Sequence, residues 1–251
     1  MIEADNKLYF DDRYKKLGFF SPVDICFVIY NQGMWGSLRK QLKASRTIVD
    51  FGCGGGTLLM NVYRENPKAR LIGIDFSEGS KVLFESNVPV AEFRKEDLSN
   101  TSLDDDSVDL ALSTMTIEHI EEGPFLKEVK RVLRPGGLLF ISSVVKRPYG
   151  WYFYKNSEGR RVLESTHLRE YSSMREFENM LKSHGFEPVE SGVSLIKYPA
   201  FDPAIKYLFN KVSRSRSQQF LTSRPIEFLR KYLRIPIPGY YSVECLVKNS
   251  K

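Results

Sequence analysis

Cysteines are few in this sequence. The chain of 251 residues has three, Cys26, Cys53 and Cys245, and they lie far apart without the spacing of zinc ligands. This scarcity argues against a structural zinc site and favours reduced thiols in a reducing compartment. We therefore expect no metal site.

Targeting and membrane-spanning segments are also missing. The N-terminus has no basic stretch followed by an apolar core, so we expect no signal peptide. No window approaches the roughly 18 consecutive apolar residues that a membrane span needs. With 42% hydrophobic and 27% charged residues, the composition is typical of a globular protein. These absences predict a cytoplasmic location, which leaves room for peripheral contact with a membrane surface.

Positive charge is unevenly distributed along the chain. Residues 1–150 carry 20 basic and 21 acidic side chains, whereas residues 151–251 carry 17 and 10. The formal net charge of +6 therefore belongs to the C-terminal part. A positive charge confined to one region indicates an anionic partner, whereas a uniform excess mostly affects solubility.

Short apolar runs alternate with longer helical ones after residue 45. The runs predict strands at 47–52, 71–76, 91–97, 108–114, 138–145, 187–196 and 240–248, and helices at 58–66, 77–87, 123–133 and 169–186. The strands before residue 146 are apolar throughout, which is typical of a parallel sheet covered on both faces. We predict an α/β fold, a Rossmann-like doubly wound and mostly parallel seven-stranded sheet with helices on both faces.

Two further segments flank or interrupt this pattern. Residues 1–45 predict an amphipathic, aromatic-rich N-terminal helical cap on a single domain at 46–251. A basic, aromatic insert at about 199–239 separates the last two predicted strands. Consecutive antiparallel strands need far shorter connections, so this insert is an addition to the core.

The stretch VDFGCGGGTLL at 49–59 joins a strand to a helix through four glycines. Glycine permits positive φ and has no Cβ, so a ligand can lie against the bare main chain. The start of the following helix offers unpaired N–H groups. A dinucleotide-binding loop would have glycine where Thr57 stands, and a P-loop would continue with Gly-Lys-Ser/Thr. Both are excluded.

Five stretches together resemble a known family. VDFGCGGG, LIGIDFS, FRKEDLS, LDDDSVDLALSTMTIEHI and EVKRVLRPGGLLFIS are similar to class I S-adenosylmethionine-dependent methyltransferases of the type 11 group, which includes ubiquinone and menaquinone biosynthesis enzymes. The resemblance covers about 45–145 and, more loosely, 165–196. It implies that 46–251 is a class I methyltransferase domain with S-adenosyl-L-methionine as its cofactor.

The resemblance implies roles at the ends of the first two strands. Asp50 and the loop glycines Gly52, Gly54 and Gly56 would line the methionine end of the cofactor. Asp75 would accept both ribose hydroxyls, since two neighbouring O–H donors match the two oxygens of a carboxylate.

The resemblance also implies roles for residues that follow the second, third and fourth strands. Phe76 would lie against the adenine, Asp97 would take its amino group, and the Leu98 N–H would meet a ring nitrogen. Ser113 and Thr114 would pass near the reactive sulfur. Open α/β sheets bind ligands at the carboxyl ends of their strands, where all these positions lie.

The three histidines divide into two groups. His184 precedes a glycine at the end of a predicted helix and is interpreted as a helix-cap residue. His119, just past the fourth strand, and His167, after the fifth, are the candidate catalytic residues, as a base or a substrate contact. For His119 a structural hydrogen bond is the alternative. Arg169 and Tyr171 would hold an anionic or ring substrate, or mark a solvated helix start.

Absent motifs narrow the methyl acceptor. The sequence has no Asn/Asp-Pro-Pro-Tyr motif, which similar enzymes use on exocyclic amines, and no Pro-Cys pair of the kind used at pyrimidine C5. We therefore expect O- or C-methylation of a small-molecule or lipid-linked acceptor.

The basic segment at 201–236 leaves alternatives open. Its basic amphipathic character suits peripheral contact with an anionic membrane, and a helical lid packed on the sheet is the alternative. Attraction of RNA to the same segment would make the protein an RNA methyltransferase, although nucleic acid is the less favoured partner. A non-catalytic cofactor-binding regulator is the third possibility.

Overall fold

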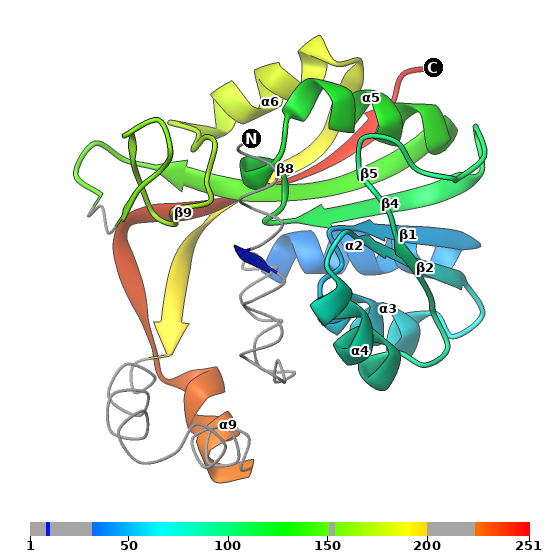
Figure 1. The fold of residues 1–251 in the computed structure, drawn as a ribbon, viewed down its shortest axis with the longest axis horizontal. Helices are drawn as coiled ribbons and strands as arrows, with labels where there is room; N and C mark the ends of the chain where they lie inside the picture. The colour runs from blue at the N-terminus through cyan, green and yellow to red at the C-terminus, as the bar shows by residue number, and fades with distance from the viewer. Residues whose placement is uncertain (1–8, 11–31, 151–153, 200–223) are drawn as a thin grey trace.

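A seven-stranded sheet forms the centre of the molecule (Figure 1). The computed structural model describes residues 9–10, 32–150, 154–199 and 224–251. The strand order is β3-β2-β1-β4-β5-β9-β8, with β9 antiparallel to both of its neighbours and the pairs from β3 to β5 parallel. The predicted Rossmann-like, mostly parallel, seven-stranded sheet is confirmed.

The elements follow the predicted alternation of strands and helices. The strands of the main sheet are β1 (Thr47–Phe51), β2 (Arg70–Asp75), β3 (Glu92–Lys95), β4 (Val108–Thr114), β5 (Leu133–Lys146), β8 (Phe186–Pro199) and β9 (Arg234–Asn249). The helices are α2 (Gln32–Ala44), α3 (Thr57–Glu65), α4 (Glu78–Asn87), the 3-10 turn η2 (Ile117–His119), α5 (Glu122–Val132), α6 (Met174–Ser183) and α9 (Arg224–Tyr232). A separate two-stranded sheet pairs β6 (Tyr154–Lys155) with β7 (Arg161–Val162).

Helices cover both faces of the sheet, with α5 and α6 on one face and α2, α3 and α4 on the other (Figure 1). Neighbouring residues of β1 show the consequence, because Ile48 packs into one core cluster and Val49 into the other. Successive side chains of a strand point to opposite faces, so a strand buried on both sides is apolar at every position.

The strand β3 departs from this rule. It lies at the edge of the sheet, and three of its four residues are charged. Glu92 forms ion pairs with Arg70 and Arg94, and Lys95 forms one with Glu78. β3 is therefore shorter than the strand predicted at 91–97, and its charged residues depart from the expectation that these strands are apolar throughout, because an edge strand can tolerate charge.

Two expected boundaries are wrong. The helix predicted at 169–186 begins only at Met174, where the Ser173 side chain accepts from the Glu176 N–H, because Tyr171 pairs with Val145 as a strand-like bridge. β8 continues to Pro199, and β9 begins at Arg234. The connection between the two strands therefore spans 200–233 instead of the expected 199–239.

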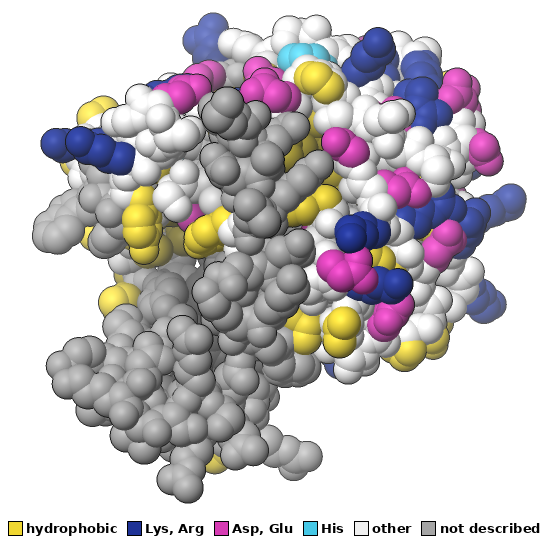
Figure 2. Space-filling view, in the orientation of Figure 1, with side chains coloured by type: hydrophobic (Ala, Val, Ile, Leu, Met, Phe, Trp, Pro, Cys, Tyr) yellow, Lys and Arg dark blue, Asp and Glu magenta, His cyan; other side chains and the backbone are white. Residues whose placement is uncertain are grey.

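Several expectations fall only partly within the described residues. Of the N-terminal helical cap predicted over 1–45, the range 32–44 is the helix α2, while 1–8 and 11–31 lie outside the described part. Of the basic segment, 200–223 lies outside it. Among the described residues, no helix has the length and apolar character needed to cross a membrane. Basic and acidic side chains are interspersed over the described part of the face in Figure 2.

Candidate functional site

The glycine loop between β1 and α3 is held in a conformation that favours glycine. Gly52, Gly54 and Gly56 have φ values of 80°, 49° and 76°. A Cβ on Gly52 would lie 2.4 Å from the Thr116 Oγ1, and one on Gly56 would lie 2.8 Å from the Phe84 ring. Internal packing therefore requires two of these glycines, whether or not a ligand lies against the main chain.

Asp50 is buried at the carboxyl end of β1. Its side chain is 2% exposed, and burial together with the nearby Asp75 carboxylate raises the pKa of Asp50 to about 8. Its Oδ1 has no hydrogen-bond partner among the described residues, and neither has the buried Oγ of Ser113 at the end of the adjacent strand β4. Buried polar atoms without a hydrogen-bond partner are energetically costly and uncommon. Two of them at the carboxyl ends of neighbouring strands therefore mark a place where a polar ligand fits.

Asp75 ties the loop to the end of β2. Its Oδ2 accepts a hydrogen bond from the Gly54 N–H at 2.9 Å, and its Oδ1 accepts one from the Ser77 N–H at 2.9 Å. The Ser77 side chain in turn caps α4 by accepting a hydrogen bond from the Ser80 N–H. Each carboxylate oxygen accepts more than one hydrogen bond, so Asp75 is compatible with a ligand bearing two hydroxyls.

The predicted adenine-side residues follow β3. Asp97 is exposed, and its Oδ1 accepts from the Ser99 N–H at 2.9 Å, while Leu98 is buried. Both lie beyond the carboxyl end of β3, two strands away from the end of β1. The expected cofactor residues therefore line one edge of the sheet, with Ser113 and Thr114 closing the series on β4.

A row of aromatic rings leads from this edge to the two candidate histidines. The Phe76 and Phe10 ring centroids are 6.2 Å apart, those of Phe10 and His119 are 5.1 Å apart, and those of His119 and His167 are 4.8 Å apart. Phe10 comes from the N-terminal segment and packs edge-on against both partners. The structure thus brings together His119 and His167, which are 48 residues apart in the sequence, just beyond the end of β4.

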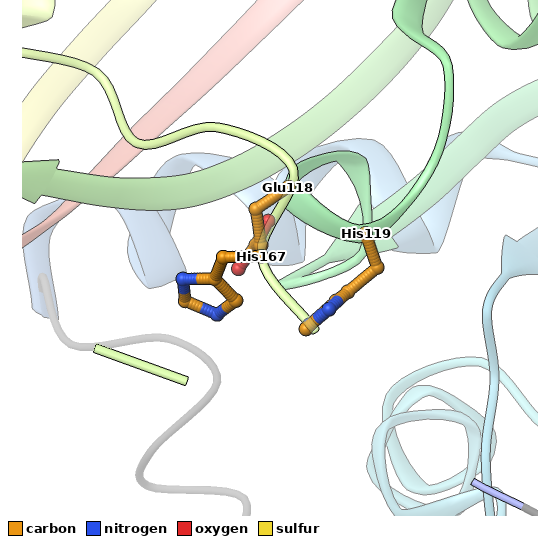
Figure 3. A group of neighbouring side chains, drawn as sticks. All are labelled: Glu118, His119 and His167. Carbon is orange, nitrogen blue, oxygen red and sulfur yellow. The ribbon is translucent and has the colours of Figure 1, made fainter. Parts of the chain in front are cut away.

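Glu118 joins the two histidines in a compact cluster (Figure 3). Glu118 and His119 come from the turn η2 after β4, whereas His167 comes from the loop before α6. One ligand atom from each side chain lies within 4.8 Å of the others. Glu118 is 1% exposed, and its Oε2 accepts from the Ser143 hydroxyl at 3.0 Å. Burial raises the pKa of Glu118, and the charge of His167 opposes the rise.

His167 is held by a second buried carboxylate. Its Nδ1 lies 2.8 Å from the Glu170 Oε1, which also accepts from the Leu163 N–H at 2.6 Å. Lys146 Nζ lies 3.7 Å from the other Glu170 oxygen. Burial opposes charge on the His167 ring, but the hydrogen bond to Glu170 and the charge of Glu118 outweigh it and raise the pKa of His167. These contacts leave Nε2 as the ring nitrogen not bonded to Glu170.

Arg169 and Tyr171 have structural contacts instead of forming a solvated helix start. The Arg169 guanidinium donates to the carbonyl oxygens of Ile117 and Ile120 at 2.8 and 2.5 Å and so clamps the turn η2. Tyr171 is 4% exposed, and its hydroxyl donates to Glu122 at 3.2 Å. His184 occupies the C-cap position of α6, as expected.

Glu118 and Glu170 were not identified from the sequence as part of this site, and neither was the unusual backbone conformation of Met115 beside it. Glu118 stands next to His119, and Glu170 lies three residues after His167, which were the available signals. Met115 has a φ of 51°, an uncommon value for a residue other than glycine, at the end of β4. Nothing in the sequence pattern indicates that value.

Known proteins resemble this chain in sequence and in fold. The family model described as "Methyltransferase domain" matches residues 49–141. A probable S-adenosylmethionine-dependent methyltransferase of Mycolicibacterium smegmatis is 32% identical over 149 residues, which is 57% of this chain and 53% of that protein. A malonyl-[acyl-carrier protein] O-methyltransferase of Methylococcus capsulatus is 26% identical over 75% of this chain and 72% of its own.

A solved structure extends the likeness over nearly the whole fold. The geranyl diphosphate C-methyltransferase of Streptomyces coelicolor, in complex with Mg²⁺, geranyl diphosphate and S-adenosyl-L-homocysteine, covers 99% of this chain and 97% of its own with a TM-score of 0.59. Its sequence identity is 14%, so this likeness concerns the fold alone. The chain spans about half or less of the length of the first curated relatives that it matches.

Proposed function

We propose that this chain, which belongs to the class I S-adenosylmethionine-dependent methyltransferases of type 11, transfers a methyl group from S-adenosyl-L-methionine to a small-molecule or lipid-linked acceptor. One observation carries the proposal: the buried Asp50, with an oxygen that has no partner among the described residues, lies beside the glycine loop and Asp75. A cation fits this place because it would compensate the buried carboxylate charge. The cofactor carries such cationic groups at its methionine end.

In this proposal, different residues of the chain bind different parts of the cofactor. Asp50, Gly52, Gly54 and Gly56 hold the methionine end, where the exposed main chain and the start of α3 supply N–H groups. Asp75, which holds the backbone N–H groups of Gly54 and Ser77, accepts the ribose hydroxyls.

The nucleoside and the sulfur meet the next strands along the edge. Phe76 packs against the adenine, Asp97 takes its amino group, and the Leu98 N–H faces a ring nitrogen. Ser113 and Thr114 lie beside the sulfur at the end of β4. The order of the residues along the edge follows the strand order β3-β2-β1-β4, which supports one extended ligand lying across four strand ends.

The acceptor side is formed by His119 and His167 in this proposal. His119 packs against Phe10, which also packs against Phe76, and His167 packs against His119. This chain of contacts supports an acceptor bound near the end of β4, where His119 follows the strand. When bound, the cofactor supplies a methyl group on a positively charged sulfur. The protein then has to hold the acceptor atom in line, roughly 3 Å from the methyl carbon, and exclude water. Phe10 supports the exclusion of water by covering His119.

A curated relative supports methylation at oxygen, because the Methylococcus protein is described as an O-methyltransferase. Carbon stays in the proposal because the sequence lacks the motifs for exocyclic amines and for pyrimidine C5. We therefore keep O- or C-methylation as the proposed reaction and leave the choice to experiment.

A peripheral membrane contact through 201–236 is the second part of the proposal. Within its described portion, Phe228, Leu229 and Tyr232 on α9 expose 63%, 41% and 65% of their surface. Arg230 and Lys231 stand between Leu229 and Tyr232 in the sequence. Apolar side chains beside cations suit an anionic lipid surface. Cosedimentation with anionic vesicles tests this contact, and Phe228→Ser should weaken it while neutral vesicles bind neither protein.

Methyl-labelled cofactor tests the function directly. The protein is incubated with it and with an extract of the host, and the label is followed into the lipid, RNA and small polar fractions. We expect label in the lipid or small polar fraction, and less of it with Asp75→Ala at a cofactor concentration near the dissociation constant of the wild type. Label confined to RNA would overturn the acceptor class. Cofactor binding without labelled product in any fraction would indicate a regulator.

A further inference from the structure

The Glu118–His119–His167 cluster has the composition of a metal site. Among the described residues it brings two imidazoles and one carboxylate to within 4.8 Å of one another (Figure 3). A tetrahedral cation with bonds of about 2.0–2.2 Å holds its ligand atoms roughly 3.5 Å apart. Closing the cluster around a cation therefore takes movements of about 1 Å, which side-chain rotations supply.

The contacts around the cluster are those that orient metal ligands. The Glu170 carboxylate lies 2.8 Å from the His167 Nδ1, which directs the other ring nitrogen away from Glu170. The Ser143 hydroxyl fixes one oxygen of Glu118, and Arg169 fixes the turn that carries Glu118 and His119. Carboxylates and backbone groups that hold a ligating histidine in this way set its orientation and raise its basicity as a ligand.

We propose that Glu118, His119 and His167 bind a divalent transition-metal cation whose open coordination position meets an oxygen of the methyl acceptor. The inference rests on the proposed methyl transfer and names the class of acceptor, an oxygen ligand such as a hydroxyl or carboxylate. It goes against the expectation of no metal, which considered cysteine spacing alone.

The ligand set selects the kind of cation. Two imidazoles and one carboxylate suit Zn²⁺, Co²⁺, Ni²⁺ or Fe²⁺, whereas Mg²⁺ and Ca²⁺ prefer oxygen ligands throughout. Three protein ligands leave a fourth position open, as in catalytic zinc sites. The Phe10 ring packs against His119, one of the proposed ligands, and against Phe76.

An oxygen bound at the open position gains acidity, so a hydroxyl acceptor loses its proton to water more easily. The oxygen then forms a bond to the methyl carbon while the carbon–sulfur bond breaks and its electron pair stays on the sulfur. The histidines act through the cation in this proposal, which replaces the expected histidine base. A carboxylate acceptor has no proton to lose and only needs to be positioned.

Cobalt binding tests the site on the full chain. Protein freed of metal with a chelator is titrated with Co²⁺, and the visible bands of the cobalt complex report binding. We expect one Co²⁺ per chain, with an affinity that Mg²⁺ in large excess does not reduce. Absence of saturable one-to-one binding would overturn the proposal.

Variants locate the cation. His167→Ala and Glu118→Gln should weaken Co²⁺ binding at least 10-fold, and Glu170→Gln should weaken it about 10- to 100-fold as the loss of an outer partner. The control is His184→Ala, which removes the histidine outside the cluster and should leave binding unchanged. Equal binding by wild type and His167→Ala would overturn the assignment.

Calorimetry with S-adenosylhomocysteine on the same preparations separates this inference from the proposed function. Every variant should keep its affinity for this compound, which also demonstrates that the variant folds. Retained cofactor binding without Co²⁺ binding would reject the metal site and leave the methyltransferase proposal standing. Loss of cofactor binding in the wild type would reject the proposed function itself.

Discussion

Cofactor binding should release a proton from Asp50. Burial and the charge of Asp75 raise the pKa of Asp50 to about 8, so the free protein at neutral pH holds this side chain mostly in its uncharged form. A cationic group of the cofactor beside the unpartnered Oδ1 favours the carboxylate. The proton then has to leave as the cofactor enters.

The size of the release follows from the pKa. At pH 7, one unit below a pKa of about 8, roughly nine in ten molecules carry the proton on Asp50. If the cofactor returns the pKa to near the ordinary value, about 0.9 proton leaves per cofactor bound at pH 7, and about 0.1 at pH 9. The affinity for the cofactor therefore rises with pH up to about 8 and then levels off.

Calorimetry in several buffers measures this number. Titrations at pH 7 in buffers of different ionisation enthalpy give a heat that changes with the buffer in proportion to the protons released. Asp50→Asn should abolish the buffer dependence, whereas Asp97→Asn, which alters an exposed acid of the same site, should keep it even if the affinity falls. A wild-type release near zero, or an equal release from Asp50→Asn, would refute the reasoning.

Three further predictions concern the same edge of the sheet. Asp75→Ala should weaken cofactor binding by about 1–3 kcal/mol, because the hydrogen bonds to a charged acceptor are lost. Calorimetry measures this change, and an unchanged affinity would show that the ribose assignment is wrong. Gly56→Ala should lower the free energy of unfolding by about 1–3 kcal/mol more than Gly159→Ala does, because both have positive φ but only the first Cβ would meet Phe84; equal losses in chemical denaturation would disprove the clash. Because the pKa of Asp50 is raised in the folded state, the cofactor-free protein loses stability as pH rises from about 4 to about 8. Asp50→Asn should therefore raise the melting temperature more at pH 8 than at pH 5. A difference in melting temperature that does not depend on pH would contradict this.

The central sheet was predictable because burial of both of its faces requires apolar residues at successive positions. Ile48 and Val49 enter cores on opposite faces, so β1 had to be apolar without alternation, and the same holds for β4. The cap by Ser77 was equally local. Such features need only a few residues of context, which a sequence supplies.

The errors lie where distant contacts decide the structure. The segment around Tyr171 has helix-like composition but pairs with Val145 on β5. Residues 234–239 contain two prolines, which are uncommon inside strands, yet Pro236 pairs with Lys197 where β9 runs along β8. Neither contact leaves a periodic pattern in its own segment.

The candidate site divides in the same way. Asp50 and Asp75 follow predicted strands, so their place at one edge could be deduced from the sheet. Glu118 and His167 meet only because the turn after β4 and the loop before α6 fold together. Pairing across 49 residues has no local signal, and the role of Glu170 depends on it.

A crystal structure of the protein with S-adenosylhomocysteine tests the central claim most directly. We predict the amino-acid end of the compound against Asp50 and the glycine loop, its ribose on Asp75 and its adenine between Phe76 and Asp97. A compound bound elsewhere, or an edge that stays empty at saturating concentration, would contradict it.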